Sequence, residues 1–258
     1  VAMFLFSLQV LGLSFLPWDF AQDNGFNAVG TVNAFALYAG FMAVLALALL
    51  CRGTVTKRMR AWGGILAGVS FLLVFLVGYW AAFICFIVAS GIFVFLDARS
   101  EEKKMPRRHL VPLAAIVISA CMLVLATGIV SIPVPRIAAS AEVAPSVRAS
   151  FTIALRTARE GARSFLLGSG PSTYQYQYGK YHDAGLNNTI FWNVRFTQGF
   201  DAILTSLVSL GLFGTLFFLF FILGVSHMMV RLVANRRMDH AAIALVSTGA
   251  YAVIALFL

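Results

Sequence analysis

Charged side chains are scarce in this sequence, and their scarcity argues against a water-soluble fold. Only 11% of the 258 residues are Asp, Glu, Lys or Arg, whereas 60% are hydrophobic. A soluble domain carries roughly 25% charged residues, which cover its water-facing surface. The mean hydropathy of +0.89 and the 24 phenylalanines agree with this reading. The composition therefore predicts an integral membrane protein whose surface is largely solvated by lipid.

Cysteine pairs and metal-ligand patterns are also missing. The three cysteines, Cys51, Cys85 and Cys121, lie in or at the end of apolar runs, so no disulfide framework or thiolate metal site is indicated. No His/Glu cluster, paired Asp residues, Walker motif or dinucleotide fingerprint occurs. We expect neither a metal nor a cofactor. We also expect no nucleic-acid partner despite the net charge of +9, because excess Lys and Arg mainly sets orientation in membrane proteins.

Seven apolar stretches dominate what is present. A membrane span needs about 20 apolar residues, and none of the stretches has an acidic or basic residue in its interior. They lie at 1–17, 31–51, 62–78, 80–96, 110–132, 203–229 and 241–258. The third and fourth nearly touch, which predicts a tight hairpin around Gly78–Trp80. The sequence thus predicts an all-α polytopic transmembrane bundle of about seven spans, truncated at both ends because it starts and stops inside apolar runs.

Basic residues divide the connectors into two kinds. Twelve of the 19 Lys and Arg follow the second, fourth and sixth stretches, and the connectors at 18–30 and 78–80 have none. Short basic loops stay cytoplasmic. The long connector at 133–202, which holds the other seven, is then extracytoplasmic. The predicted organisation is five spans in 1–132, an outer loop at 133–202 and two spans in 203–258.

The outer loop contains a predicted amphipathic helix from its N-cap Ser146 to about Leu167. One face is apolar and is formed by Val147, Phe151, Leu155, Ala158, Ala162 and Phe165. Four arginines form the neighbouring edge: Arg148, Arg156, Arg159 and Arg163. Two interpretations stay open. The helix lies on the membrane with its arginines at lipid phosphates, or the arginines bind a diphosphate through bidentate contacts.

The rest of the loop offers weaker candidates. The turn at 168–171 (GSGP) is either a helix stop or an anion cradle built from backbone N–H groups. The aromatics that follow are interfacial anchors or platforms for sugar rings, with Tyr174, Tyr176 and Trp192 as the stacking candidates. His182 is a solvated loop histidine or a general base.

As a whole, the string resembles the O-antigen ligase and polymerase family of bacterial membrane glycosyltransferases. The likeness lies in the order of three elements: residues 25–33 (GFNAVGTVN) at the head of a span, residues 164–174 (SFLLGSGPSTY) in the outer loop, and residues 207–214 (LVSLGLFG) at the next span. The second is similar to the family's P-x-G-x-G-P-G-x-F turn, and the third matches its E-x-G-x-x-G element in the glycines. Ser209 stands where the family has Glu, and Phe200 and Asp201 stand where many members have His-Asn.

The resemblance implies a glycosyltransferase of the GT-C type in the bacterial cytoplasmic membrane. Such enzymes move a glycan from an undecaprenyl-diphosphate carrier to a lipid or sugar acceptor without a metal ion. It also implies that loop arginines bind the diphosphate, for which Arg148, Arg156, Arg159, Arg163 and Arg195 are the candidates. The general base is then Asp201, His182 or Glu142.

Two other classes stay open. One is a lipid-glycan flippase or transporter, although coupled transporters usually carry ionisable residues within their spans. The other is a non-catalytic membrane assembly partner, which the missing His-Asn pair favours.

Overall fold

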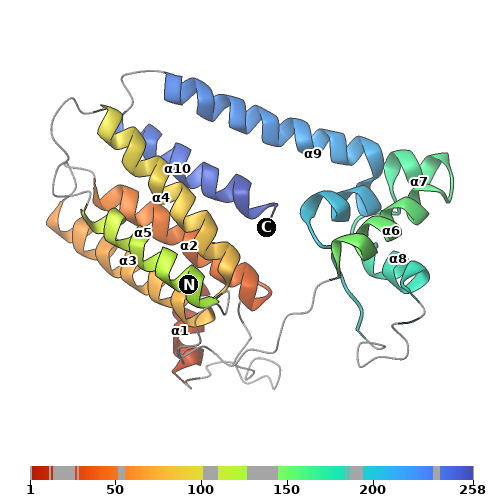
Figure 1. The fold of residues 1–258 in the computed structure, drawn as a ribbon, viewed down its shortest axis with the longest axis horizontal. Coiled ribbons are helices and arrows are strands. Elements are labelled where there is room, and N and C mark those ends of the chain that lie inside the picture. Colours follow the sequence, from red (N-terminus) through yellow and green to blue (C-terminus); the bar gives the residue numbers. More distant parts are fainter. Residues whose placement is uncertain are drawn as a thin grey trace. The chain divides into compact units, whose positions relative to one another are not determined.

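The computed structural model describes residues 2–11, 13, 27, 29–51, 56–100, 110–126, 145–183, 185, 194–234 and 239–257. These residues form helices and no strand. The helices are α1 (Ala2–Val10), α2 (Val32–Leu50), α3 (Lys57–Val77), α4 (Trp80–Ser100), α5 (Leu110–Ala126), α6 (Val147–Ala158), α7 (Ala162–Leu167), α8 (Tyr174–Tyr181), α9 (Ala202–Ala234) and α10 (His240–Ala255) (Figure 1). The prediction of an all-helical chain is confirmed.

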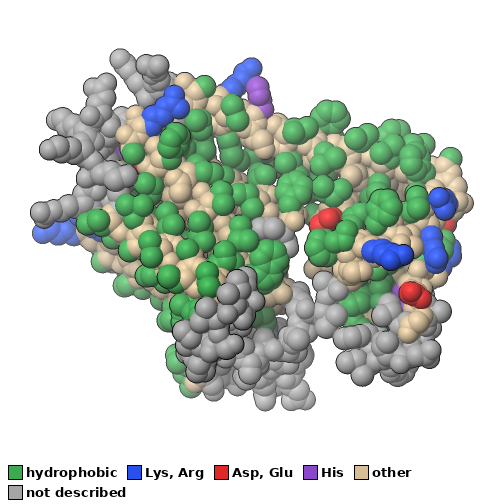
Figure 2. Space-filling view, in the orientation of Figure 1, with side chains coloured by type: hydrophobic (Ala, Val, Ile, Leu, Met, Phe, Trp, Pro, Cys, Tyr) green, Lys and Arg blue, Asp and Glu red, His purple; other side chains and the backbone are tan. Residues whose placement is uncertain are grey.

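Four helices are long and apolar enough to cross a membrane: α2, α3, α4 and α9. The apolar helices α5 and α10 are shorter, and hydrophobic side chains are spread over the visible face (Figure 2). The chain therefore has the character of a membrane protein with four candidate spans. The predicted seven spans include 1–17 and 110–132, of which only parts are described, so that number stays a prediction.

The chain forms two compact units. The first is made by the described residues within 1–142 and 228–255, and the second by those within 143–227 and 256–258. In the first unit α2 packs against α3, α4 and α10, and α4 packs against α5 and α10. Small residues make these approaches close, since Ala36, Ala39 and Ala43 on α2 are fully buried.

The predicted hairpin after the third apolar stretch is present as a tight turn. α3 ends at Val77 and α4 begins at Trp80, and Gly78 between them adopts a left-handed conformation with φ 68°. Its amide donates to the Val74 carbonyl. Glycine adopts this conformation without the strain that a Cβ brings, which explains why the helix stops here.

A close helix contact in the first unit joins α2 to α10. The Tyr251 ring, which is almost fully buried, lies against the backbone of Gly40. A Cβ on Gly40 would lie 2.9 Å from Cζ of Tyr251 and closer still to its hydroxyl oxygen. That hydroxyl has no hydrogen-bond partner among the described residues. The absence of a side chain at Gly40 therefore lets a bulky tyrosine fit between two helices.

We expect Gly40→Ala to lower the free energy of unfolding by about 1–3 kcal/mol, the usual effect of overpacking a filled core. Thermal unfolding in detergent measures it. Adding Tyr251→Phe removes the nearest atom and should restore part of the loss. Gly68→Ala on α3 is the matched control, because nothing lies within 4 Å of its added Cβ. Equal stability of the Gly40 and Gly68 variants would contradict the contact.

An ionisable pair lies inside the first unit, between the end of α4 and the start of α10. α4 continues past the apolar run to Ser100, so Asp97 falls within a candidate span, and its side chain is fully buried. Nδ1 of His240, the first residue of α10, lies 3.0 Å from Oδ1 of Asp97. The apolar stretches predicted at 80–96 and 241–258 do lack charged residues, and both members of the pair lie one residue outside them. The apolar run ends one residue before Asp97, but the helix does not.

The second unit contains α6, α7, α8 and most of α9. Its core consists of Ile153, Ala154, Tyr174, Tyr178 and Val208. The single helix predicted from Ser146 to Leu167 is in fact two helices. α6 ends at Ala158, and α7 begins at Ala162 after Gly161 and ends at Leu167, as predicted. Ser146 does cap α6 as predicted, accepting a hydrogen bond from the Ala149 amide. α9 is also interrupted, since Gly211 has non-helical angles of φ 67° and ψ −165°.

Candidate functional site

Two glycine-containing turns, distant in sequence, lie in direct backbone contact in the second unit. A Cβ on Gly168 would lie 2.5 Å from the Gly211 amide nitrogen, and one on Gly211 would lie 2.7 Å from the Leu166 carbonyl. Both glycines have positive φ, 71° and 67°. Only two residues without side chains can approach so closely in these conformations. We call this contact the glycine junction.

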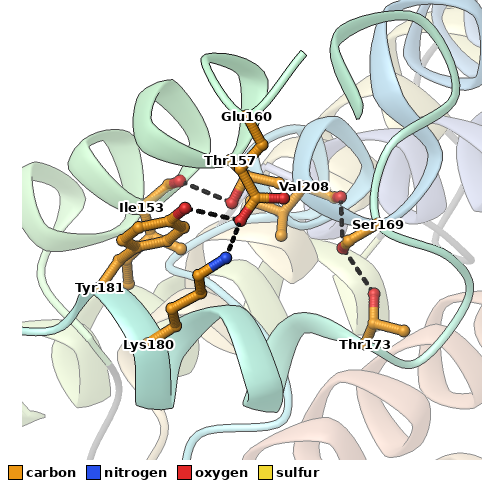
Figure 3. Close-up of polar contacts among 8 residues, drawn as sticks. All are labelled: Ile153, Thr157, Glu160, Ser169, Thr173, Lys180, Tyr181 and Val208. Atoms are coloured by element: carbon orange, nitrogen blue, oxygen red, sulfur yellow. Dashed lines mark hydrogen bonds and ion pairs between the residues drawn. The ribbon is translucent and has the colours of Figure 1, made fainter. Parts of the chain in front are cut away.

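Hydrogen bonds complete the glycine junction. The interruption of α9 at Gly211 leaves the carbonyls of Val208 and Ser209 without partners inside the helix. The amides of Ser169 and Gly170 donate to them, each at 2.9 Å. The Ser169 hydroxyl also donates to the Val208 carbonyl and lies 2.6 Å from the Thr173 hydroxyl (Figure 3).

The anion-cradle interpretation of the 168–171 turn is therefore wrong, because Pro171 has no N–H and the other three amides are already used. The Gly168 amide donates to the Ser164 carbonyl as a helix C-cap, and the next two donate across the glycine junction. None of the three is left for a phosphate oxygen. The turn does stop α7, which agrees with the helix-stop interpretation.

Ser150 connects three segments of the second unit. Its buried hydroxyl oxygen accepts a 2.9 Å hydrogen bond from the Phe200 amide and a 3.3 Å hydrogen bond from the Tyr174 hydroxyl. α6, α8 and the turn before α9 are thereby joined at one atom. Sequence reasoning did not single out Ser150, because a serine within an amphipathic pattern gives no sign that it is buried.

The candidate arginines are all exposed, but they do not form one continuous edge. Arg148 and Arg156 lie on α6, Arg159 is its C-cap, and Arg163 lies on α7 beyond the break. Arg195 is exposed in the segment that precedes α9. Within the described part of the chain, no carboxylate forms an ion pair with any of the five. Their charges are thus available to an anion from outside.

The acidic residue nearest to these arginines in sequence is already occupied. Glu160 Oε1 lies 2.7 Å from Lys180 Nζ and accepts a 2.6 Å hydrogen bond from the Tyr181 hydroxyl (Figure 3). Arg156 donates to the Tyr181 carbonyl at 3.4 Å. These contacts fasten the end of α6 to the end of α8. Sequence reasoning missed Glu160, whose partners are about 20 residues away in the chain.

The contacts of Glu160 should make the stability of the protein depend on pH. The Lys180 hydrogen bond and then the Tyr181 hydrogen bond lower the pKa of Glu160 below its ordinary 4.5. A lowered pKa in the folded state stabilises the protein above the unfolded-state pKa, and this contribution disappears as pH falls through the folded-state value. Thermal unfolding should show Glu160→Gln less stable than the unmodified protein at pH 7. The difference should begin to shrink near pH 4.5 and vanish only once the pH is below the folded-state pKa of Glu160. A constant difference across that range would contradict the ion pair.

His182 has a structural role at the end of α8. Its Nδ1 lies 3.1 Å from the carbonyl oxygens of both Tyr178 and Gly179, and its ring stacks on Tyr178 at a centroid distance of 5.4 Å. Because both neighbours are acceptors, Nδ1 carries the proton. His182 is therefore no freely solvated loop residue, and its role as a base stays a prediction.

Asp201 is the N-cap of α9. Its Oδ1 accepts a 2.7 Å hydrogen bond from the Leu204 amide, and its backbone carbonyl accepts from the Thr205 amide and hydroxyl. An aspartate is among the preferred residues at this position. The carboxylate is partly exposed, so the cap does not remove it from solvent.

The candidates for stacking on a sugar ring differ in their exposure to solvent. Tyr174 is fully buried and donates to Ser150, so its ring is not available to a sugar, and this assignment is wrong. Burial raises the pKa of Tyr174, and the charge of Asp201 adds to the increase. The phenol therefore remains a hydrogen-bond donor. Tyr176 is 68% exposed and keeps its candidacy. Trp192 and the candidate base Glu142 lie outside the described residues.

No group of three His, Cys, Asp or Glu side chains that could hold a metal occurs among the described residues. Comparison with family models, curated proteins and solved structures finds no match for this chain.

Proposed function

We propose that this chain is a membrane glycosyltransferase that moves a glycan from an undecaprenyl-diphosphate carrier to a lipid or sugar acceptor. The glycine junction is the observation that supports it best. Two of the three elements on which the resemblance rests, the loop element 164–174 and the span element 207–214, contact each other through Gly168 and Gly211. The unpaired arginines belong to the same compact unit. The proposal includes seven spans in a bacterial cytoplasmic membrane, with 133–202 on the outer side.

The proposed reaction is a single displacement at the anomeric carbon. The acceptor hydroxyl attacks that carbon, the bond to the diphosphate oxygen breaks, and the carrier leaves as undecaprenyl diphosphate with the bonding electron pair. Arginines stabilise the charge that develops on the leaving group. Asp201 is the first candidate to take the acceptor proton, because the α9 cap uses Oδ1 and a carboxylate has further acceptor sites.

Reconstitution tests the proposal. The protein in liposomes would receive an undecaprenyl-diphosphate glycan and an acceptor lipid, and the glycosylated acceptor would be measured by mass spectrometry. We expect product only when carrier and acceptor are both present. Absence of product with intact, folded protein and several acceptor classes would reject the enzyme and favour a non-catalytic assembly partner.

A second candidate function is transport of the lipid-linked glycan. The buried Asp97–His240 pair favours it, because ionisable residues within spans are typical of coupled transporters. Movement of a fluorescent lipid-linked glycan between leaflets distinguishes the two. A transporter would move the glycan with no acceptor present, and Asp97→Asn would abolish that movement.

A further inference from the structure

α6 exposes the face that its sequence would lead one to bury. The side chains of α6 that contact the protein core are Ser150, Ile153, Ala154 and Thr157, and all four are buried. The larger apolar side chains point away from that core. Val147, Phe151 and Leu155 are 50%, 56% and 40% exposed. We call these three residues, spaced four apart on one side of the helix, the apolar ridge.

The apolar ridge belongs to a helix that packs beside the start of a candidate span. Ile153 and Ala154 share a core with Val208 on α9. α9 has 33 residues, which is about 50 Å at 1.5 Å per residue, longer than the roughly 30 Å hydrocarbon core. Residues 212–234, beyond the interruption at Gly211, are about 34 Å long, which is enough to span that core without the first turns of α9. The segment before Gly211, against which α6 packs, then lies at the membrane surface.

Around the axis of α6, the apolar side chains are followed directly by arginines. A bilayer surface has the same sequence of layers, apolar acyl chains followed by anionic phosphates. At 100° per residue, Arg148, Arg159 and Arg156 follow the apolar ridge on one side, at roughly 60°, 80° and 140° from Phe151. No acidic residue occurs in α6. At a bilayer surface the apolar ridge would contact acyl chains and the arginines would contact the phosphates above them. Water would solvate the arginines but not the apolar ridge.

We propose that the apolar ridge inserts into the interfacial layer of the phospholipid bilayer, with the α6 arginines held at the level of the lipid phosphates. This anchoring does not require glycosyl transfer. If the proposed function is also correct, the same depth brings the arginines to the diphosphate of a membrane-bound carrier. Insertion then determines the position of the binding groups relative to their substrate.

Spin labels on single cysteines test the insertion in the full chain reconstituted in liposomes. Cys121, the exposed cysteine among the three, is replaced by alanine, whereas Cys51 and Cys85 are buried and shielded from the label. Labels are placed at Phe151→Cys and, separately, Leu155→Cys. Gly179→Cys on α8 is the control, since it is exposed and its added Cβ meets nothing within 4 Å. Collision rates are measured with oxygen, which concentrates in lipid, and with a water-soluble nickel complex.

We expect the oxygen-to-nickel ratio at 151 and 155 to exceed that at 179 several-fold. Replacing Arg148, Arg156 and Arg159 by glutamine should reduce the ratio at both ridge positions. Ratios equal to that at 179 would show that the ridge faces water and would overturn the proposal. Exclusion of both reagents would show that protein, such as a second copy, covers it, and would equally overturn it. If the variant labelled at 151 or 155 fails to fold, a label at Val147→Cys replaces it, because Val147 belongs to the same apolar ridge.

Discussion

Gly168→Ala and Gly211→Ala are each expected to lower the free energy of unfolding of the second unit by about 3 kcal/mol or more. Two effects add at each position. The backbone angles of the two glycines, φ 71° and ψ −170° at Gly168 and φ 67° and ψ −165° at Gly211, lie in a region that essentially only glycine occupies. A side chain there costs about 1–3 kcal/mol, and overpacking costs about another 1–3 kcal/mol. The added Cβ would meet backbone atoms at 2.7 Å or less, and backbone cannot rotate aside as a flexible side chain does. The hydrogen bonds from Ser169 and Gly170 to α9 would be lost with the contact.

Gly224→Ala is the matched control for the glycine junction. It lies on the same helix α9, is exposed, and has nothing within 4 Å of its added Cβ. We expect it to be neutral or stabilising by up to about 1 kcal/mol, because alanine is the better helix former. Thermal unfolding in detergent, followed by circular dichroism, compares the three variants. Unchanged stability of the Gly168 and Gly211 variants would contradict the junction.

The double variant Arg156→Ala with Arg159→Ala should lower kcat/KM for glycan transfer by about 10²–10³-fold, the usual effect of removing groups that stabilise a developing anion. Both side chains are exposed, and the 3.4 Å hydrogen bond from Arg156 to the Tyr181 carbonyl is weak, so folding should be only slightly affected. The effect should fall on kcat as well as KM, because the diphosphate gains charge as the glycosidic bond breaks. Product formation against carrier concentration in liposomes measures both constants.

Two controls separate the diphosphate contact from general loss of positive charge. Arg156→Lys with Arg159→Lys keeps both charges but removes the bidentate geometry, and should recover only part of the activity. Arg231→Ala removes one exposed arginine from the last turn of α9 and should have little effect. Full activity of the double alanine variant would reject the arginine assignment while leaving the glycosyltransferase proposal standing.

The helices could be predicted from the sequence because long apolar runs have few alternatives in a membrane. The four candidate spans overlap runs at 31–51, 62–78, 80–96 and 203–229. The positions at which helices are interrupted were harder to predict. Gly161 ends the predicted 146–167 helix early, and Gly211 interrupts α9, although glycine inside an apolar helix is common. Only the contact with Gly168 gives Gly211 its conformation, and that contact depends on tertiary structure.

The exposure of the candidate arginines could be predicted from the sequence, but the burial of other candidate residues could not. The wheel pattern of α6 correctly separates its apolar side from its arginines, but the pattern cannot tell which side packs against protein. The small residues Ser150 and Ala154 face the core instead of Phe151, because they permit the close approach of Tyr174 and α9. A tyrosine has a large apolar ring, which suits both a membrane interface and a protein core. The sequence alone therefore could not show that Tyr174 is buried. Asp97 and His240 meet only through the packing of α4 on α10.

The fate of the carrier lipid tests the central proposal most directly. The reconstituted protein would be supplied with acceptor and with an undecaprenyl-diphosphate glycan on one side of the bilayer, and every undecaprenyl species would be followed by mass spectrometry. We predict one free undecaprenyl diphosphate for each glycosidic bond formed on the acceptor. Glycan that crosses the bilayer still attached to its carrier, with no free undecaprenyl diphosphate, would contradict glycosyl transfer and identify a flippase.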